Sequence, residues 1–128
     1  MNRNILFTFI SQHYAIEPDY PWGTQADYAV LRHTSSRKWF GLVFRINAGK
    51  LDLMSDRIVD VINLKVHPEM VGALRQQPDV FPAYHMNKEH WISVPLEGGL
   101  CDTEILSLLD ESYNLTRPRS RGSKLSRQ

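Results

Sequence analysis

The residue types best suited to chemistry gather in one short stretch of the chain, residues 83–96, where a polar segment runs directly into an apolar one. The polar segment combines hydrogen-bond donors and acceptors, a cation, two imidazoles and aromatic rings. Its members are Tyr84, His85, Asn87, Lys88, Glu89, His90 and Trp91. This polar cluster is the first candidate for a binding or catalytic site.

The two histidines of the cluster allow more than one chemistry. His85 and His90 could ligate a metal or move protons near neutral pH. However, Glu89 is the one further ligand at suitable spacing, and Lys88 would repel a cation. A structural role is therefore the better interpretation, and we expect no metal. We predict that Asn87 and one of the histidines hydrogen-bond backbone groups of a tight loop between two short strands.

A second candidate surface is basic. Phosphate contacts need cations and small polar donors on projecting turns, and the sequence HTSSRK at residues 33–38 supplies both. The expected nucleic-acid contacts are Arg32, His33, Arg37, Lys38, Lys65 and Lys88. Trp39 and Trp91 could stack on bases, but each opens an apolar segment, which favours a place in the core. Such a turn can also be simply solvated.

Composition limits the class of protein. The 128 residues, 42% hydrophobic and 23% charged, indicate one soluble domain, and no apolar run is long enough to span a bilayer. No secretory signal pattern is present, and the single Cys101 excludes an internal disulfide, so we expect a cytoplasmic protein. Residues 1–116 have a formal charge of −4, whereas residues 117–128 contain five basic residues and no acid. We expect a folded domain over 1–116 and a basic disordered tail over 117–128.

Apolar periodicity and turn residues predict the order helix, three strands, helix, two strands, helix. The predicted elements are a helix over 2–14 capped by Asn2 or Asn4, strands over 28–33, 39–46 and 59–66, a helix of about three turns from Pro68, strands over 80–84 and 90–96, and a helix capped by Asp102. We expect Tyr20 and Trp22 to anchor the loop over 15–27. This order indicates an α+β fold with a single antiparallel sheet of about five strands, covered on one face by helices.

Several strings of the sequence together resemble one known family. They are YPW at 20–22, the expected hairpin DYAVLRH and KWFGLVF, the segment from VINLKV to SVPLEG, and the ending LLDESYNLT. These strings resemble the MmcQ/YjbR family over nearly all of residues 2–116, and PAYHMNKEHWISV is the most specific of them. The resemblance implies a CyaY-like, or frataxin-like, fold and DNA binding through wing-like strand hairpins, a double wing. Frataxin-like iron binding is not carried over, because residues 1–16 contain no Asp or Glu.

Two functions remain open at this point. The first is a DNA-binding module without enzymatic activity or cofactor, and the alternative is a protein-interaction or adaptor domain that uses the same polar surface. The sequence contains no glycine-rich phosphate loop, nucleophile elbow or zinc spacing, and the lone Cys101 is expected to be inert. Placement discriminates between the two, because basic residues gathered on one face favour nucleic acid.

Overall fold

The computed structural model describes residues 1–23, 27–51 and 56–118. Its helices and strands follow the expected order, with two short 3₁₀ helices, η2 and η3, between them. The elements are α1 (Arg3–Tyr14), β1 (Tyr28–Arg32), β2 (Trp39–Asn47), η2 (Ala48–Leu51), β3 (Ile58–Lys65), η3 (Pro68–Met70), α2 (Val71–Leu74), β4 (Phe81–Pro82), β5 (Trp91–Pro95) and α3 (Asp102–Thr116). Residues 119–128, most of the expected disordered tail, lie outside the described residues.

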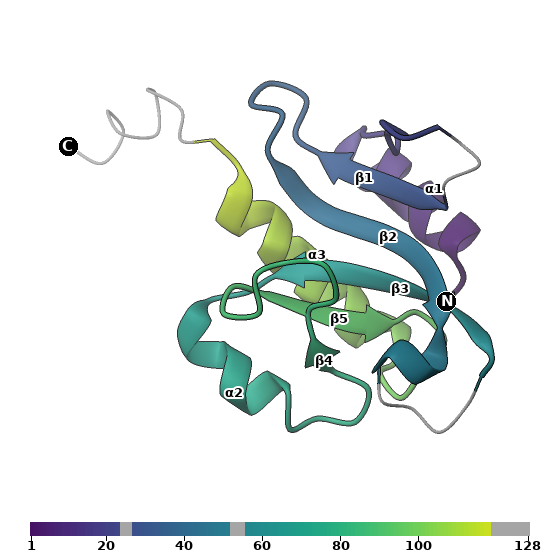
Figure 1. The fold of residues 1–128 in the computed structure, drawn as a ribbon. Coiled ribbons are helices and arrows are strands. Elements are labelled where there is room, and N and C mark those ends of the chain that lie inside the picture. Colours follow the sequence, from purple (N-terminus) through teal and green to yellow (C-terminus); the bar gives the residue numbers. More distant parts are fainter. Residues whose placement is uncertain (24–26, 52–55, 119–128) are drawn as a thin grey trace.

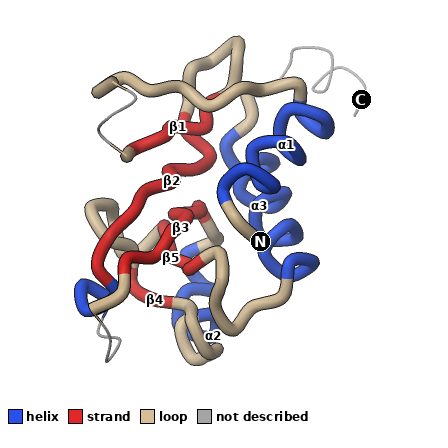
Figure 2. Tube along the Cα trace, turned by 90° about the vertical axis from the view of Figure 1, so that its right-hand side faces the viewer, coloured by secondary structure: helices blue, strands red, loops and turns tan. Residues whose placement is uncertain are grey.

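The five strands form one antiparallel sheet in the order β1-β2-β3-β5-β4. Figure 1 looks onto one face of this sheet, with α1 and α3 behind it, and Figure 2 shows the same two layers from the side. We call the face covered by α1 and α3 the helical face and the opposite one the open face. The predicted α+β fold, one antiparallel sheet covered on one face by helices, is confirmed. The likeness to CyaY stays a prediction.

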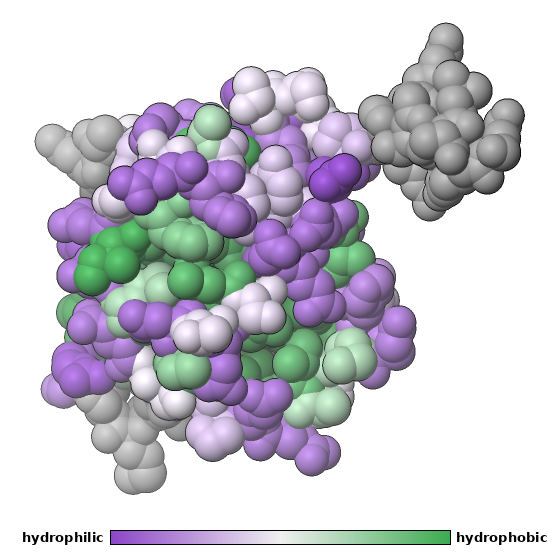
Figure 3. All heavy atoms as spheres, turned by 180° about the vertical axis from the view of Figure 1, so that it is seen from behind, coloured by the Kyte–Doolittle hydropathy of each residue, from purple (hydrophilic) through white to green (hydrophobic). Residues whose placement is uncertain are grey.

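Most of the core lies between the helical face and the two long helices. Side chains of a strand alternate between the two faces, so every second residue of the central strands meets fully buried side chains such as Leu6 of α1 and Ile105 of α3. Asn2 caps α1 as predicted, because its Oδ1 accepts the backbone N–H of Ile5 at 2.9 Å. Seen from behind, hydrophilic side chains surround smaller apolar areas over these helices (Figure 3).

An irregularity in the hairpin of β1 and β2 decides which way Trp39 points. Leu31 of β1 lies opposite Gly41 of β2. The next residue, Arg32, lies opposite Trp39, which leaves Phe40 as an extra residue in a β-bulge. Phe40 is fully buried in the core of the helical face, whereas Trp39 packs against the apolar cluster of the open face. The bulge therefore turns this tryptophan away from the helices.

The open face has an apolar cluster of its own, partly covered by the loop over residues 83–90. The buried members of this cluster are Val30, Leu42, Phe44, Leu51 and Val61. Tyr84 and Met86 of the loop pack against the cluster. Figure 1 shows the loop crossing in front of β3 and β5. The loop is thus held against the sheet through Tyr84 and Met86, while His85, Asn87, Lys88 and Glu89 of the polar cluster stay exposed.

Two predicted elements are shorter than expected. The helix from Pro68 consists of one 3₁₀ turn followed by the four residues of α2. Gly72 lies inside α2, and glycine is one of the weakest helix formers. The strand predicted over 80–84 shrinks to the two residues of β4, because Pro82 has no N–H to extend the ladder and the chain then leaves the sheet to form the 83–90 loop.

The start of the last helix is also corrected. Cys101 occupies the cap position, and Asp102 is the first residue of α3. The Cys101 N–H donates to Glu104 Oε1 at 3.1 Å, which is the spacing of a capping box. Asp102 and Glu104 both lie in the first turn, where the helix dipole favours negative charge. Among the described residues, no helix is long and apolar enough to cross a bilayer.

Candidate nucleic-acid interface

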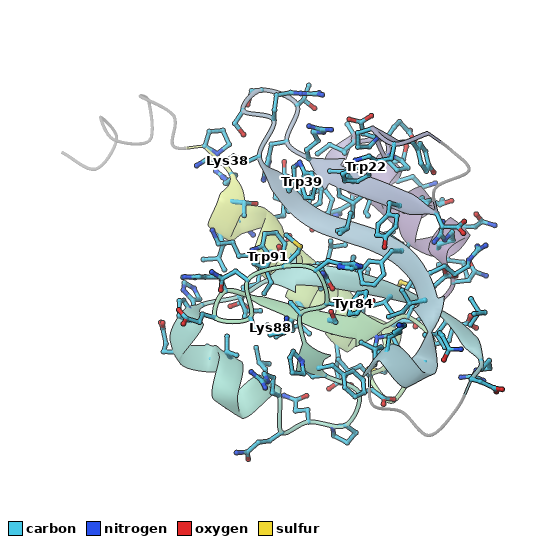
Figure 4. All side chains as sticks on the ribbon, viewed as in Figure 1. Trp22, Lys38, Trp39, Tyr84, Lys88 and Trp91 are labelled. Atoms are coloured by element: carbon cyan, nitrogen blue, oxygen red, sulfur yellow. The ribbon has the colours of Figure 1, made fainter. Side chains whose placement is uncertain are left out.

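The most distinctive feature of the open face is a groove beside β1 and β2, which we call the aromatic groove. It is lined by Trp22, Tyr28, Trp39, Leu42, His85 and Met86 and has a volume of about 450 Å³. The centroid of the Trp22 ring lies 5.9 Å from that of Tyr28 and 6.0 Å from that of Trp39, and both pairs meet nearly edge to face. Trp22 and Trp39 are labelled in Figure 4. Among the described residues, no acidic side chain lines the groove.

A bridge between Asp19 and β1 holds the segment that carries Trp22. The backbone groups of Asp19 and Val30 exchange two hydrogen bonds of 2.8 and 2.9 Å. The Asp19 carboxylate also binds the guanidinium of Arg32 at 2.7 Å. Both contacts fix the segment along the free edge of β1, next to the groove.

The chain then turns and projects Trp22. The Gly23 N–H donates to the carbonyl of Tyr20 at 3.0 Å, and Pro21 occupies the second position of this turn, which suits its fixed φ. Tyr20 packs against the core of the helical face, as expected of an anchor. Trp22 is 57% exposed, so its predicted anchoring role is wrong. Its ring instead borders the aromatic groove.

Two buried polar residues fasten the 83–90 loop to the sheet. Asn63 and Ser93 are direct cross-strand partners, and both are fully buried. Asn63 Nδ2 donates to the Tyr84 carbonyl at 2.7 Å, and the Tyr84 N–H donates to Ser93 Oγ at 2.9 Å. The Ser93 hydroxyl in turn donates to Asn63 Oδ1. Because each of these groups has a partner, the network fixes the start of the loop relative to the strands.

Asn87 has the structural role predicted for it. Its Oδ1 accepts the N–H of Glu89 at 2.7 Å, and its carbonyl accepts the N–H of Trp91 at 3.0 Å. The histidine half of that prediction is wrong, because neither imidazole of His85 and His90 forms a hydrogen bond within the described residues. Asn87 therefore shapes the loop that presents the two rings.

His85 contributes to the groove through its ring. Its backbone has a φ of 66°, in the left-handed region that residues other than glycine seldom adopt. Its imidazole lies 3.9 Å from the ring of Tyr84 and 6.2 Å from that of Tyr28, centroid to centroid. In the part of the chain that the structure describes, no three His, Cys, Asp or Glu side chains gather as metal ligands.

His33, one of the six expected nucleic-acid contacts, is buried. It is 4% exposed, and its Nε2 lies 2.9 Å from Thr116 Oγ1. The Thr116 hydroxyl donates its proton to the Ser112 carbonyl at 2.7 Å, so in the bond to His33 the imidazole Nε2–H is the donor. Burial lowers the pKa of His33 from its ordinary value of 6.5, and the Tyr113 carbonyl acts in the opposite direction. The expectation is corrected accordingly: His33 ties the hairpin to the end of α3, and its ring is not available to a ligand.

Arg32 and Arg37 both interact with Asp19, but to different degrees. The side chain of Arg32 is 19% exposed and lies 2.7 Å from the carboxylate. That of Arg37 is 64% exposed and lies 3.7 Å from the same oxygen. Arg32 is therefore occupied in positioning the Trp22 segment, and Arg37 keeps most of its guanidinium in solvent.

Lys65 lies on the open face, Lys88 in the loop over it and Lys38 in the hairpin turn, and none of the three forms an ion pair within the described residues. Lys65 shares this face with Asn63, two residues earlier on β3, and pairs with Trp91 across the sheet. Lys88 is exposed in the 83–90 loop, and Lys38 is exposed in the hairpin. In Figure 4, Trp91 lies between Lys38 and Lys88.

The two tryptophans expected in the core have intermediate positions. Trp39 and Trp91 are both half-buried, Trp39 at the aromatic groove and Trp91 opposite Lys65. They join the basic residues at the hairpin end of the open face. We call the surface formed by Arg37, Lys38, Lys65, Lys88, Trp39 and Trp91 the basic surface.

The acidic residues of α3 lie on the helical side of the sheet, whereas Asp19 lies 3.7 Å from Arg37 of the basic surface. Helix α3 contains four acidic residues and no basic one. Asp60 is paired with Arg3 at 2.9 Å and with Arg45 at 3.1 Å. Glu89 is the one acid of the 83–90 loop. The formal charge of −4 thus hides a locally positive end of the open face.

Fold and surface together define a class: a small two-layer α+β domain whose antiparallel sheet presents aromatic and basic side chains on its open face. A family model described as YjbR matches residues 12–115. The chain is also 41% identical over 117 residues to the protein YyaQ of Bacillus subtilis (strain 168), which covers 91% of this chain and 99% of that protein. The chain belongs to the YjbR family, as its sequence motifs predicted.

Solved structures agree with the fold. A crystal structure of a protein from Pseudomonas syringae is 50% identical and has a TM-score of 0.88, over 91% of this chain and all of that one. The Deinococcus radiodurans protein DR2400 is 23% identical, with a TM-score of 0.69 over 98% of this chain and 86% of that one, and is similar in fold alone. The protein YjbR of Escherichia coli (strain K12) is 49% identical over 53 residues, 41% of this chain and 45% of that protein.

Sequence reasoning missed the residues that build the open face. Asn63 and Ser93 interrupt otherwise apolar strands, and a polar residue inside such a strand signals a buried hydrogen-bond network. Trp22 follows Pro21 in a turn, and connecting turns run over the protein surface, so its exposure could have been expected. The pairing of Arg32 with Asp19 has no local sequence signal.

Proposed function

We propose that this protein is a non-enzymatic DNA-binding protein that contacts DNA through its basic surface. The observation that carries the proposal is that Lys38, Lys65 and Lys88 lie without ion-pair partners among the described residues, close to Trp39 and Trp91. Cations of this kind bind phosphates by releasing condensed counterions, which supplies most non-specific affinity. A net acidic domain can bind DNA only through such a local patch.

The number of available cations sets the expected salt dependence. With Arg37 as the fourth cation, about four phosphates can be neutralised, so the logarithm of duplex affinity should fall against the logarithm of salt with a slope of roughly −3 to −4. The measurement is fluorescence anisotropy of a labelled duplex over a salt series. It uses the chain ended after Thr116, because the five basic residues beyond it would add their own contacts. A thermal melt first verifies that this chain is folded.

A double variant and a single control variant test the surface itself. Replacing Lys38 and Lys88 together by Gln should flatten the slope by about two units, since each lost phosphate contact removes about one counterion. Arg75→Gln removes an exposed cation that follows α2 and should leave the slope unchanged. Absence of duplex binding at low salt, or an unchanged slope in the double variant, would refute the proposal and favour a protein-interaction domain.

A further inference from the structure

The aromatic groove is not explained by phosphate binding. Its lining is aromatic and apolar apart from the imidazole of His85, and its volume of about 450 Å³ lies within the range of pockets that hold small organic groups. Trp22 is 57% exposed at its border, although its segment is fixed by Asp19. A single exposed aromatic ring needs no special explanation, but Trp22 forms a contiguous aromatic surface with Tyr28 and Trp39, and such a surface is suited to contact with a ligand.

Ring geometry indicates a planar ligand. Trp22 meets Tyr28 at an interplanar angle of 73° and Trp39 at 83°. Neither tryptophan has a parallel ring neighbour within the described residues, whereas Tyr28 stacks on Phe44 at 18°. A planar ring can therefore stack on Trp22 or Trp39 in the way that bases stack on aromatic side chains.

Charge indicates that the ligand is anionic. No carboxylate of the described residues lines the groove, and the adjoining basic surface brings Arg37 and Lys38 directly before Trp39 in the sequence. Lys88 follows His85 by three residues in the same loop. Aromatic side chains can also bind cationic ligands such as a quaternary ammonium group, but these neighbouring cations would repel such a ligand. They complement the phosphates on either side of a nucleotide.

We infer that the aromatic groove holds an unpaired nucleobase and that the protein binds single-stranded DNA in preference to duplex DNA. This inference rests on the proposed function, since the basic surface must hold the flanking phosphates. Bases in a duplex are stacked on each other and present only their edges, so their faces cannot reach Trp22 or Trp39. A single strand can place one base in the groove and its phosphates on Lys38 and Lys88.

The test compares three labelled ligands with the full chain: a single-stranded oligothymidine, a duplex of the same length and an abasic strand of the same length and charge. The single strand should bind at least about fivefold more tightly than the abasic strand, because stacking of one base contributes about 1 to 3 kcal/mol, equivalent to about 5- to 150-fold. It should also bind more tightly than the duplex. The abasic comparison needs no variant and is independent of folding defects.

A variant pair assigns the effect to the groove. Trp22→Leu should lower affinity for oligothymidine by at least about fivefold and leave the salt slope unchanged, because no phosphate contact is lost. Ile5→Ala removes an exposed apolar side chain of α1 and should change neither. The inference would be overturned if the abasic strand and oligothymidine bound equally well, or if Trp22→Leu left the affinity for oligothymidine unchanged. Binding of the duplex in the same experiment would still support the proposed function. Failure of all three ligands to bind at low salt would overturn both.

Discussion

Replacement of Ser93 by Ala tests whether the buried network holds the 83–90 loop on the sheet. The hydroxyl of Ser93 accepts the Tyr84 N–H at 2.9 Å and donates to Asn63 Oδ1, and both Ser93 and Asn63 are fully buried. The substitution therefore leaves a donor and an acceptor without partners in a place that water does not reach. Each such group costs about 1 to 3 kcal/mol, so the free energy of unfolding should fall by about 2 to 6 kcal/mol.

The loss is measurable by urea and thermal unfolding. At about 4 °C per kcal/mol for a domain of this size, Tm should fall by roughly 8 to 24 °C. Ser107→Ala is the matched control, because Ser107 is exposed on α3 and its hydroxyl makes no hydrogen bond within the described residues. Its effect should stay within about 0.5 kcal/mol. Equal melts for Ser93→Ala and Ser107→Ala would show that the loop is held by its apolar contacts and not by the network.

Three further outcomes are expected. Ending the chain after Thr116 should leave Tm unchanged and weaken binding to DNA at low salt, because the removed residues contribute five cations and little apolar surface; a loss of cooperative unfolding would place the domain boundary elsewhere. Burial lowers the pKa of His33 in the folded state, so below pH 6.5 the unfolded chain binds more protons than the folded one. The unfolding free energy should therefore fall as pH drops from 6.5 towards the folded-state pKa. The difference in unfolding free energy between wild type and His33→Gln should vary with pH only in that window. Cys101→Ser should raise the unfolding free energy by about 0.5 to 1 kcal/mol in denaturant titrations, because Ser is a better helix cap; an unchanged or lowered value would contradict the assigned cap position.

The sequence predicted those parts of the fold that depend on local periodicity. The helix capped by Asn2 and the long strands show their apolar pattern within a few turns or pleats, and they appear as predicted. The fourth strand was predicted too long, because the apolar residues around Pro82 suggest a strand whether or not the chain pairs there. Its length is decided by the polar network of Asn63 and Ser93, which draws Tyr84 out of the ladder. That interaction joins residues far apart in sequence.

The site was predicted in its residue types and less well in their roles. The basic hairpin and the lysines were identified from composition alone, and the three lysines remain available to a ligand. Arg32 and His33 lie in the same basic hairpin as the exposed cations, but both are occupied by other residues. Asp19 binds Arg32, and Thr116, 83 residues away in sequence, binds His33. The aromatic groove was missed because it unites Trp22, the bulge that turns Trp39, and the loop that carries His85. No sequence period links these three segments.

The pairing of Arg32 with Asp19 connects the two parts of the open face. Arg32 Nε is buried without a hydrogen-bond partner among the described residues, so the Asp19 carboxylate is the main stabilisation of this guanidinium. An arginine of the basic hairpin is thereby removed from phosphate binding and fixes the segment that ends in Trp22. Since Lys38 and Trp39 follow on the same hairpin, a displacement of the hairpin would move the cations and both tryptophans together. The fold thus couples the position of the proposed phosphate contacts to that of the aromatic rings, as the proposed binding of a base together with its phosphates requires.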